Sequence, residues 1–323
     1  MNDFVDITGK IDNKLVDYDL SANCAPVLNL LLQTHIFSNT EKREAQNFDS
    51  FKYVVEQNGS KQAKIIEIRS LSDLTINHFN LLTGILSQYH SSQKGGLVLS
   101  SSELSKLLTR KKLENKQLNR IYSMITDLTS LIFTVKSYTV INEEIDLHSP
   151  DSVQHFTLFD NVTVDTRSSV NGSVCFSTVS FSLNKGIVEA YREQGSKIIR
   201  QDLLNKLSMG YSKALYRHFV AIYTGISQTL KIERTTLYRA LGLNLGDTSY
   251  GNRKIKQALA DLVEAGVVKS YVTTRGRSYL IELNDTVFDM TGKKSREELI
   301  NEALTLSEDD TSSVSVEDFL DSI

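Results

Sequence analysis

A short stretch in the last third of the chain carries side chains that can recognise nucleic acid. On a helix, Tyr250, Arg253 and Gln257 would share the face opposite the apolar Ile255 and Leu259. The residues that this helix is expected to bury are Ile255, Leu259, Leu262 and Val263. Arginine and glutamine match the hydrogen-bonding edges of guanine and adenine in the major groove of DNA, which admits one α-helix. This spacing therefore predicts a helix that reads a DNA sequence.

Further cationic and amide side chains surround this face. Lys254 and Lys256 flank it, and Asn252 lies nearer the core edge of the helix, within its first turn. Lysine and asparagine are suited to binding phosphates. A glycine-containing turn further along the chain adds two arginines. The DNA contacts expected in this region are Tyr250, Asn252, Arg253, Lys254, Lys256, Gln257, Arg275 and Arg277.

These residues need a scaffold, and the surrounding pattern predicts one. The expected elements are a helix at 211–223, a strand at 229–232, a helix that ends at Gly242, a helix at 250–265 that ends at Gly266, and strands at 267–272 and 277–283. The last two strands flank a short turn and would form a hairpin. Helix, strand, helix, helix and two-stranded hairpin is the element order of a winged helix-turn-helix.

Positive charge is concentrated in this region. The whole chain has a net charge of −3, yet the segment between Lys197 and Glu282 contains fourteen Lys and Arg and only six Asp and Glu. A solvated helix face that binds nothing is the alternative interpretation of such a run. Because the cations fall on the last helix and at the hairpin turn, where a winged helix contacts DNA, DNA binding is the preferred interpretation.

The same order of elements occurs once before, between residues 70 and 190. The pattern predicts helices at 74–89 and 114–129, a strand at 97–99, and a helix that Ser100 and Glu103 can cap reciprocally. Strands at 132–140, 155–164 and 174–183 would form an enlarged sheet and wing. The expected fold class is therefore α+β, with two tandem winged-helix domains and a disordered acidic tail.

The helix at 114–129 is expected to bury one face and to expose a polar one. Its buried residues would be Leu118, Ile121, Tyr122, Ile125 and Leu128. The first-domain DNA contacts expected from the opposite face and the preceding turn are Arg110, Lys111, Lys112, Lys116, Asn119 and Arg120. Between residues 100 and 141 there are seven Lys and Arg and three Asp and Glu, so the positive charge of this region is smaller than that between Lys197 and Glu282. Base contact and phosphate contact alone are equal alternatives for this helix.

The segments outside these units divide the chain further. We expect an N-terminal extension at 1–69 that packs on the first domain, winged helices at 70–190 and 191–290, and an acidic tail at 291–323. The extension would hold a helix at 25–37 and a hairpin at 51–68 around Asn58-Gly59. Residues 307–323 contain six acidic and no basic residues and predict disorder. That tail would either solubilise the protein or dock a partner protein.

No pattern for catalysis, metal or cofactor binding is visible. The phosphate-binding motif G-x-x-x-x-G-K-[ST] is missing, and the histidines form neither H-x-H nor H-E-x-x-H. His148, Asp151 and His155 flank one loop, but scattered surface histidines are the commoner explanation. A binding protein and not an enzyme is expected. Two isolated cysteines, no signal pattern and no long apolar run indicate a cytoplasmic protein without membrane contact.

Two tandem winged helices with the motif Tyr211-Ser212-Lys213-Ala214-Leu215-Tyr216 opening the second resemble the plasmid replication initiator (Rep) proteins that bind iterons. Leu241-Gly242, the basic third helix and the β stretch at 174–183 are similar to the family's, and the resemblance covers residues 70–283. The third helix departs from the family by ending as in general winged-helix regulators. The N-terminal hairpin and the acidic tail lie outside the shared pattern.

The resemblance implies a mechanism. Each monomer would bind one direct repeat of double-stranded DNA at a plasmid origin, help to melt neighbouring AT-rich DNA and recruit the host helicase. A dimer joined through the first domain would repress its own gene or pair origins. Two alternatives stay open: a transcriptional regulator with the same modules and no role in replication, and an adaptor whose winged helices bind protein.

Overall fold

The structure, a computed structural model, describes most of the chain up to Phe288. The described residues are 5–6, 24–37, 48–57, 60–92, 96–108, 115–141, 144–168, 174–194, 196–223, 227–243, 248–274 and 277–288. Contacts group Met1–Phe288 into one unit and Asp289–Ile323 into a second. The expected acidic tail lies outside the described residues. The division of the first unit into an extension and two domains stays a prediction.

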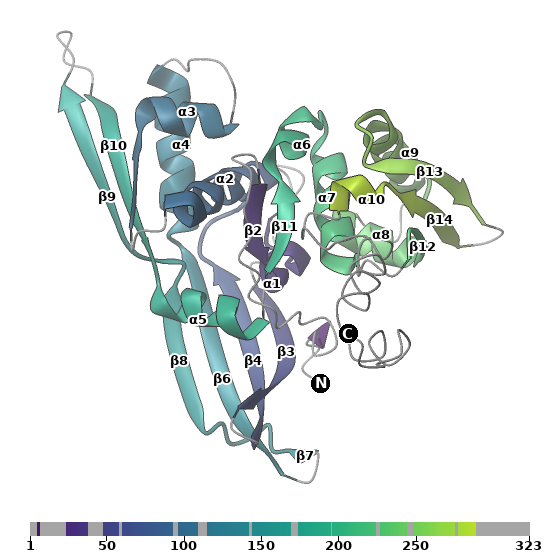
Figure 1. The fold of residues 1–323 in the computed structure, drawn as a ribbon, viewed down its shortest axis with the longest axis horizontal. Helices are drawn as coiled ribbons and strands as arrows, with labels where there is room; N and C mark the ends of the chain where they lie inside the picture. Colours follow the sequence, from purple (N-terminus) through teal and green to yellow (C-terminus); the bar gives the residue numbers. More distant parts are fainter. Residues whose placement is uncertain are drawn as a thin grey trace, which may run out of the picture. The chain divides into compact units, whose positions relative to one another are not determined.

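The later part of the first unit is a winged helix, as the pattern predicted (Figure 1). Its elements are α7 (Gly210–Ile222), β12 (Thr229–Glu233), α8 (Arg234–Leu241), α9 (Thr248–Glu264), β13 (Val268–Thr273) and β14 (Ser278–Leu283). The strands form an antiparallel sheet in the order β12-β14-β13. The short helix α10 (Asp285–Phe288) follows.

Two glycines end the helices where predicted. Gly242 caps α8 with φ 61° and ψ 36°, and its N–H donates to Arg239 O at 2.9 Å. Gly266 follows α9 with φ 75°. Side chains with a Cβ rarely adopt this left-handed conformation, so both positions favour glycine. The two stops determine where the chain turns from α8 into α9 and from α9 into the wing.

The earlier part contains the first winged helix. Its elements are α2 (Ile76–Ser92), β5 (Leu97–Ser100), α3 (Ser101–Leu108), α4 (Asn115–Leu128), β9 (Phe159–Ser168) and β10 (Val174–Leu183). The reciprocal cap is confirmed: Ser100 N–H donates to the Glu103 carboxylate at 2.8 Å, and Glu103 N–H donates to Ser100 Oγ at 3.2 Å. The strands pair in the order β5-β10-β9, so the β9–β10 hairpin is the wing.

A second, larger sheet is built from the N-terminal hairpin. It contains β1 (Val5–Asp6), β3 (Phe48–Gln57), β4 (Ser60–Ser70), β6 (Leu131–Ile141), β7 (Glu144–Ile145) and β8 (Ser152–Thr157). The hairpin is confirmed by the β3–β4 register, although Asn58 and Gly59 lie outside the described residues. Helix α5 (Lys185–Gln194) lies against β8, where Gly186 meets the Phe156 ring.

The expected single strand at 155–164 is wrong. It is two strands in different sheets, because β8 pairs with β6 whereas β9 pairs with β10. Leu158 separates them and is fully buried, and the Thr157 hydroxyl donates to Phe159 O at 2.7 Å. The apolar alternation continues through this turn, so the sequence pattern does not reveal the change of sheet.

The expected helix at 25–37 is also largely wrong. Its first part is β2 (Cys24–Leu28), which pairs antiparallel with β11 (Ser196–Arg200), and only α1 (Asn29–Gln33) is helical. A distant strand supplies the hydrogen bonds of β2, so tertiary pairing decides this segment. Helix α1 contacts α7, and the Phe37 ring lies 5.3 Å from that of Phe79 on α2. The extension therefore packs on both winged helices.

Two side chains predicted to be buried are exposed. Tyr122 on α4 is 44% exposed, and Val263 on α9 is 38% exposed. At roughly 100° per residue, each lies about 95–110° away from the centre of the buried face of its helix. The apolar pattern placed both helices correctly but made their buried faces too wide.

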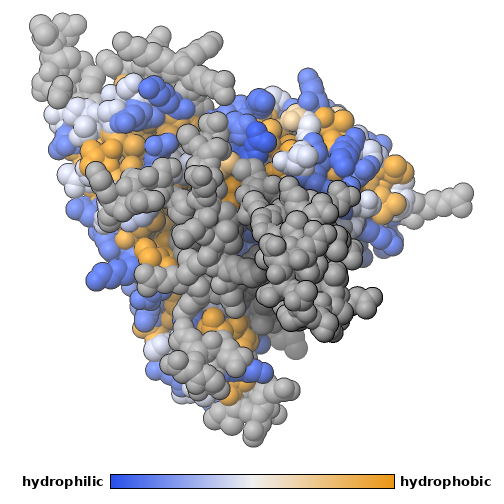
Figure 2. Space-filling model, viewed as in Figure 1, coloured by the Kyte–Doolittle hydropathy of each residue, from blue (hydrophilic) through white to orange (hydrophobic). Residues whose placement is uncertain are grey.

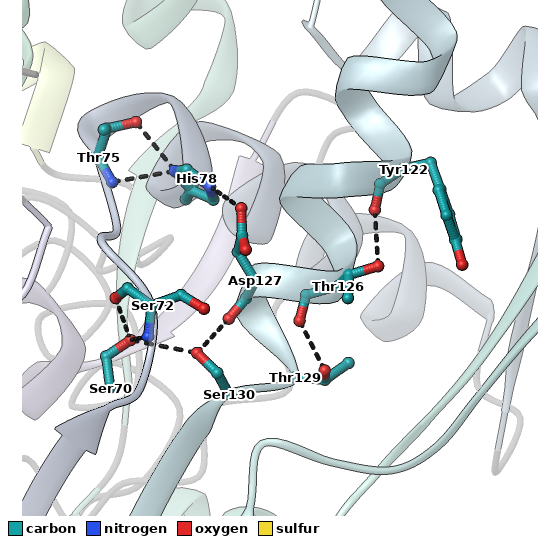
Figure 3. A network of polar contacts seen from close by, with 9 residues as sticks. All are labelled: Ser70, Ser72, Thr75, His78, Tyr122, Thr126, Asp127, Thr129 and Ser130. Carbon is teal, nitrogen blue, oxygen red and sulfur yellow. Dashed lines mark hydrogen bonds and ion pairs between the residues drawn. The ribbon is translucent and has the colours of Figure 1, made fainter.

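A polar network joins the start of α2 to the end of α4 (Figure 3). The Thr75 N–H donates to His78 Nδ1 at 3.0 Å, and His78 Nε2 lies 3.2 Å from the Asp127 carboxylate. Because an amide N–H can only donate, Nδ1 accepts and the ring proton is on Nε2. Burial lowers the pKa of His78 from its ordinary value of 6.5, with a smaller lowering from Arg120 and an opposing effect of Asp127. The fold therefore holds this histidine neutral.

This network predicts a pH dependence of stability. Since the unfolded histidine binds a proton more readily than the folded one, the contribution of His78 is complete above pH 6.5 and is lost as the pH falls through its lowered pKa. We expect the thermal midpoint of the protein to fall between about pH 7.5 and about pH 5.5. The thermal midpoint of the His78→Gln variant, whose side chain cannot titrate, should fall less over the same pH range. Circular dichroism melting measures both midpoints.

His155→Gln, at an exposed position, is the control and should melt with the pH dependence of the unmodified protein. The carboxyl groups of Asp49, Glu103 and Asp202 have lowered pKa values and titrate below this window. Equal pH dependence in His78→Gln and the unmodified protein would contradict the assignment.

Candidate nucleic-acid interface

The orientation of α9 follows from its buried face. Gly251, Ile255, Ala258, Leu259 and Leu262 are buried, and their common face packs against α7 and α8. The opposite side is open to solvent. The exposed residues predicted for DNA contact on this side are Tyr250, Arg253, Lys256 and Gln257. The structure thus presents these side chains on one outward face of the helix, whereas their contact with DNA stays a prediction.

The first turn of α9 is fixed to α8 by Tyr238. The Tyr238 hydroxyl donates to Thr248 O at 2.8 Å and to Asn252 Oδ1 at 3.4 Å. A Cβ at Gly251 would lie 2.3 Å from Cε1 of the buried Tyr238 ring, so only glycine permits this approach. Asn252 is half-buried and turned toward Tyr238. Asn252, one of the predicted contacts on α9, is thus engaged in positioning the first turn of the helix.

This close approach makes Gly251 a sensitive position. Replacing glycine by alanine inside a helix normally stabilises it by about 1 kcal/mol. Here we expect Gly251→Ala to destabilise the protein by about 1 to 3 kcal/mol, because the added methyl group overlaps a packed ring. Urea denaturation of the full chain measures the change. Ser249→Ala, exposed on the same turn, is the control, and a stabilising Gly251→Ala would contradict the packing argument.

Two cations lie over the Tyr250 ring. Arg253 Cζ is 5.5 Å from the ring centroid, and Lys254 Nζ is 5.4 Å from it. Such distances are within the range of cation–π attraction. Lys254 Nζ is also 5.5 Å from the centroid of Tyr211 on α7, and the two tyrosine hydroxyl oxygens are 3.5 Å apart. Burial, followed by the hydrogen bond with Tyr250, raises the pKa of Tyr211 to about 12.

Tyr211 was missed as a candidate site residue. The sequence shows it only as the first tyrosine of the helix at 211–223, about 40 residues before Lys254. No helical spacing connects residues on different helices, so only the packing of α7 on α9 reveals the contact. The available signal was an aromatic residue in the first turn of the helix at 211–223, and the structure leaves that residue half-buried.

The wing contributes another cation and one more missed residue. Arg277 is exposed at the turn end of the hairpin, directly before β14, and its carbonyl oxygen accepts the Arg234 N–H at 2.6 Å. Arg234 is the first residue of α8, so this bond brings a second cationic residue to the wing. Arg275 lies outside the described residues. The structure therefore joins the turn end of the wing to the start of α8, which the linear pattern does not indicate.

The first winged helix presents a smaller set of the predicted contacts. Asn119 and Arg120 are exposed on α4. Lys116 belongs to the same helix, but its side chain lies outside the described part of the structure, as do all of Arg110, Lys111 and Lys112. Arg120 is close enough to His78 to lower the pKa of that histidine. Within the described residues, these positions do not join the site on α9.

The described residues also bear on metal binding and on membrane spanning. Within the described ranges, no group of three His, Cys, Asp or Glu could hold a metal ion. His155 lies 2.9 Å from the Thr134 hydroxyl, and Asp151 accepts from Thr139, so these two residues point to separate partners. None of the helices in the same ranges is long and apolar enough to cross a membrane. Figure 2 shows hydrophilic residues over much of the visible surface of the second winged helix, with smaller hydrophobic areas between them.

Comparison with known proteins identifies the fold. No protein-family profile matches the chain, and no curated protein matches its sequence. Two crystal structures of domains 2 and 3 of RctB, one of them a selenomethionine derivative, align with TM-scores of 0.51 and 0.50 at 12% identity. They cover 79% and 80% of this chain, and 97% and 98% of their own.

A structure of the Pi initiator protein in complex with iteron DNA also aligns, at 12% identity over 69% of this chain. Its TM-score of 0.40 is too low to carry an argument. The fold of this α+β chain, with its two winged helices in tandem, is that of domains 2 and 3 of RctB.

Proposed function

We propose that this protein binds double-stranded DNA sequence-specifically at direct repeats of a plasmid replication origin and thereby initiates replication. The observation that carries the proposal is the outward face of α9, where Arg253, Lys256 and Gln257 are exposed together within a winged helix. In such modules this helix enters the major groove. Arg253 and Gln257 would read base edges, and the lysines would bind phosphates.

The cations beside α9 fit the same arrangement. Arg277 at the turn end of the wing and Arg234 at the start of α8 are joined by a backbone hydrogen bond and would contact the sugar–phosphate backbone. The local excess of eight positive charges between residues 197 and 282, in a chain of net charge −3, supports a surface for a polyanion. A protein-binding adaptor would not require this segregation of charge.

The assignment to an origin rests on the family resemblance and on the tandem arrangement. The motif at 211–216 and Leu241-Gly242 are similar to those of iteron-binding initiators, and the first winged helix would contact DNA next to the repeat read by α9. Asn119 and Arg120 on α4 are its available contacts. Self-association, repression of its own gene and recruitment of a host helicase, in the cytoplasm, complete the proposal.

A transcriptional regulator with the same modules would also bind DNA. Footprinting of the protein on the DNA that flanks its own gene, followed by a replication assay of a plasmid carrying that DNA, separates the two functions. Direct repeats about two helical turns long and protein-dependent replication would support an initiator. A footprint without protein-dependent replication of the plasmid would instead support a transcriptional regulator.

The α9 assignment predicts a loss of specificity on removal of two cations. We expect Arg253→Ala combined with Lys256→Ala to abolish specific binding, because a bidentate base contact and a phosphate contact are lost, while the thermal midpoint stays unchanged. A gel-shift assay at fixed salt, with the footprinted and a random duplex, measures the specificity ratio.

The charge-matched control is Lys206→Ala combined with Lys269→Ala, two exposed lysines outside α9. It should lower binding to both duplexes equally and leave the ratio intact. If the α9 variant keeps its specific affinity, the assignment of α9 as the helix that reads the DNA sequence is wrong.

A further inference from the structure

We propose that Tyr211 is a positioning residue of the DNA interface, and that its ring and that of Tyr250 hold the Lys254 ammonium ready to bind one backbone phosphate. The proposal rests on the proposed DNA-binding function of α9 and deepens it. It assigns a role to α7, a helix that carries none of the predicted contacts. It also separates Lys254 from Lys256, which is exposed on the same helix and has no ring contact among the described residues.

The geometry that carries this inference joins two helices. Lys254 Nζ lies 5.5 Å from the Tyr211 centroid and 5.4 Å from the Tyr250 centroid, so both rings contact one ammonium group. The two hydroxyl oxygens are 3.5 Å apart, which places the rings beside one another. Tyr211 belongs to the first turn of α7 and Tyr250 to the first turn of α9. A rigid contact between the helices therefore determines the position of the ammonium.

The charge of Lys254 is available to an external anion. Within the described residues no carboxylate forms an ion pair with Lys254, and the side chain is only half-buried. A ring face attracts the cation but carries no net charge, so it cannot neutralise the ammonium. The N–H donors of the Lys254 ammonium that do not point toward a ring can bind a phosphate oxygen. The rings thus restrict the position of the ammonium and leave its charge free.

This restriction affects binding through conformational entropy. A free lysine side chain has many rotamers and loses them when it contacts a phosphate. The two rings limit those rotamers before DNA arrives, so less freedom is lost on binding. Tyr250 also contacts Arg253, whose planar guanidinium can stack on a ring and still use its N–H groups for a base edge. Tyr211 has no such contact with Arg253 among the described residues, so its effect can be measured separately.

The role of Tyr211 should therefore concern phosphate contact and not sequence reading. We expect Tyr211→Leu to weaken binding to the footprinted duplex and to a random duplex by the same factor, about two- to fivefold. Tyr211→Phe keeps the ring and loses only the hydroxyl group, so it should bind as the unmodified protein does. The full chain is used throughout, and circular dichroism melting establishes that each variant is folded.

A double-variant cycle tests whether the effect passes through Lys254. Lys254→Met should reduce the slope of log affinity against log salt by about 0.9, the value for one lost phosphate contact. In the Lys254→Met background, Tyr211→Leu should cause no further loss. Lys256→Met is the matched control, because Lys256 is exposed on the same helix and has no ring contact in the described structure. In that background, Tyr211→Leu should keep its full effect.

The possible failures are distinguishable. If the unmodified protein binds neither duplex, the proposed function itself is wrong. If it binds but Lys254→Met leaves the salt slope unchanged, Lys254 has only a structural role and the inference fails. The inference also fails if Tyr211→Phe weakens binding as much as Tyr211→Leu, or if Tyr211→Leu has the same effect in the Lys254→Met and Lys256→Met backgrounds.

Discussion

The candidate interface depends on the contact between the Tyr238 ring and Gly251. A buried aromatic ring from α8 occupies the space that a side chain on α9 would fill, and its hydroxyl group donates to Thr248 O. The first turn of α9 can therefore take only a narrow range of positions. Because Tyr250, Arg253 and Lys254 extend from that turn or from the next residues, their geometry follows from this one packing contact.

The second constraint is electrostatic. A chain of net charge −3 cannot attract a polyanion as a whole, so any binding of DNA must use a local surface. The second winged helix has such a surface on α9, at the turn end of the wing and at the start of α8. Within it, the cations differ: Lys256 extends freely, whereas Arg253 and Lys254 lie against the Tyr250 ring. A surface of this kind combines cations that are already positioned with cations that can adapt.

The N-terminal extension connects the two winged helices. Strand β2 pairs with β11, which directly precedes the second winged helix, and the Ser87 hydroxyl of α2 donates to Cys24 O at 2.7 Å. The buried Gln201 side chain of α6 (Gln201–Lys206) donates to Asn80 O at 3.0 Å. Arg217 of α7 lies 5.1 Å from the Phe79 ring centroid on α2. These contacts make the first unit continuous across both modules.

The sequence by itself determined the helices of both winged helices, the glycines that end α8 and α9, and the reciprocal cap of Ser100 and Glu103, because helix periodicity and caps depend on residues close in the chain. It also placed Arg253, Lys256 and Gln257 on an outward face. Only the tertiary structure decided that residues 24–28 form a strand, that Leu158 separates two sheets, and that Tyr211 meets Lys254. Each of these three features depends on residues that are distant in the chain, and the spacing of neighbouring residues cannot predict such contacts.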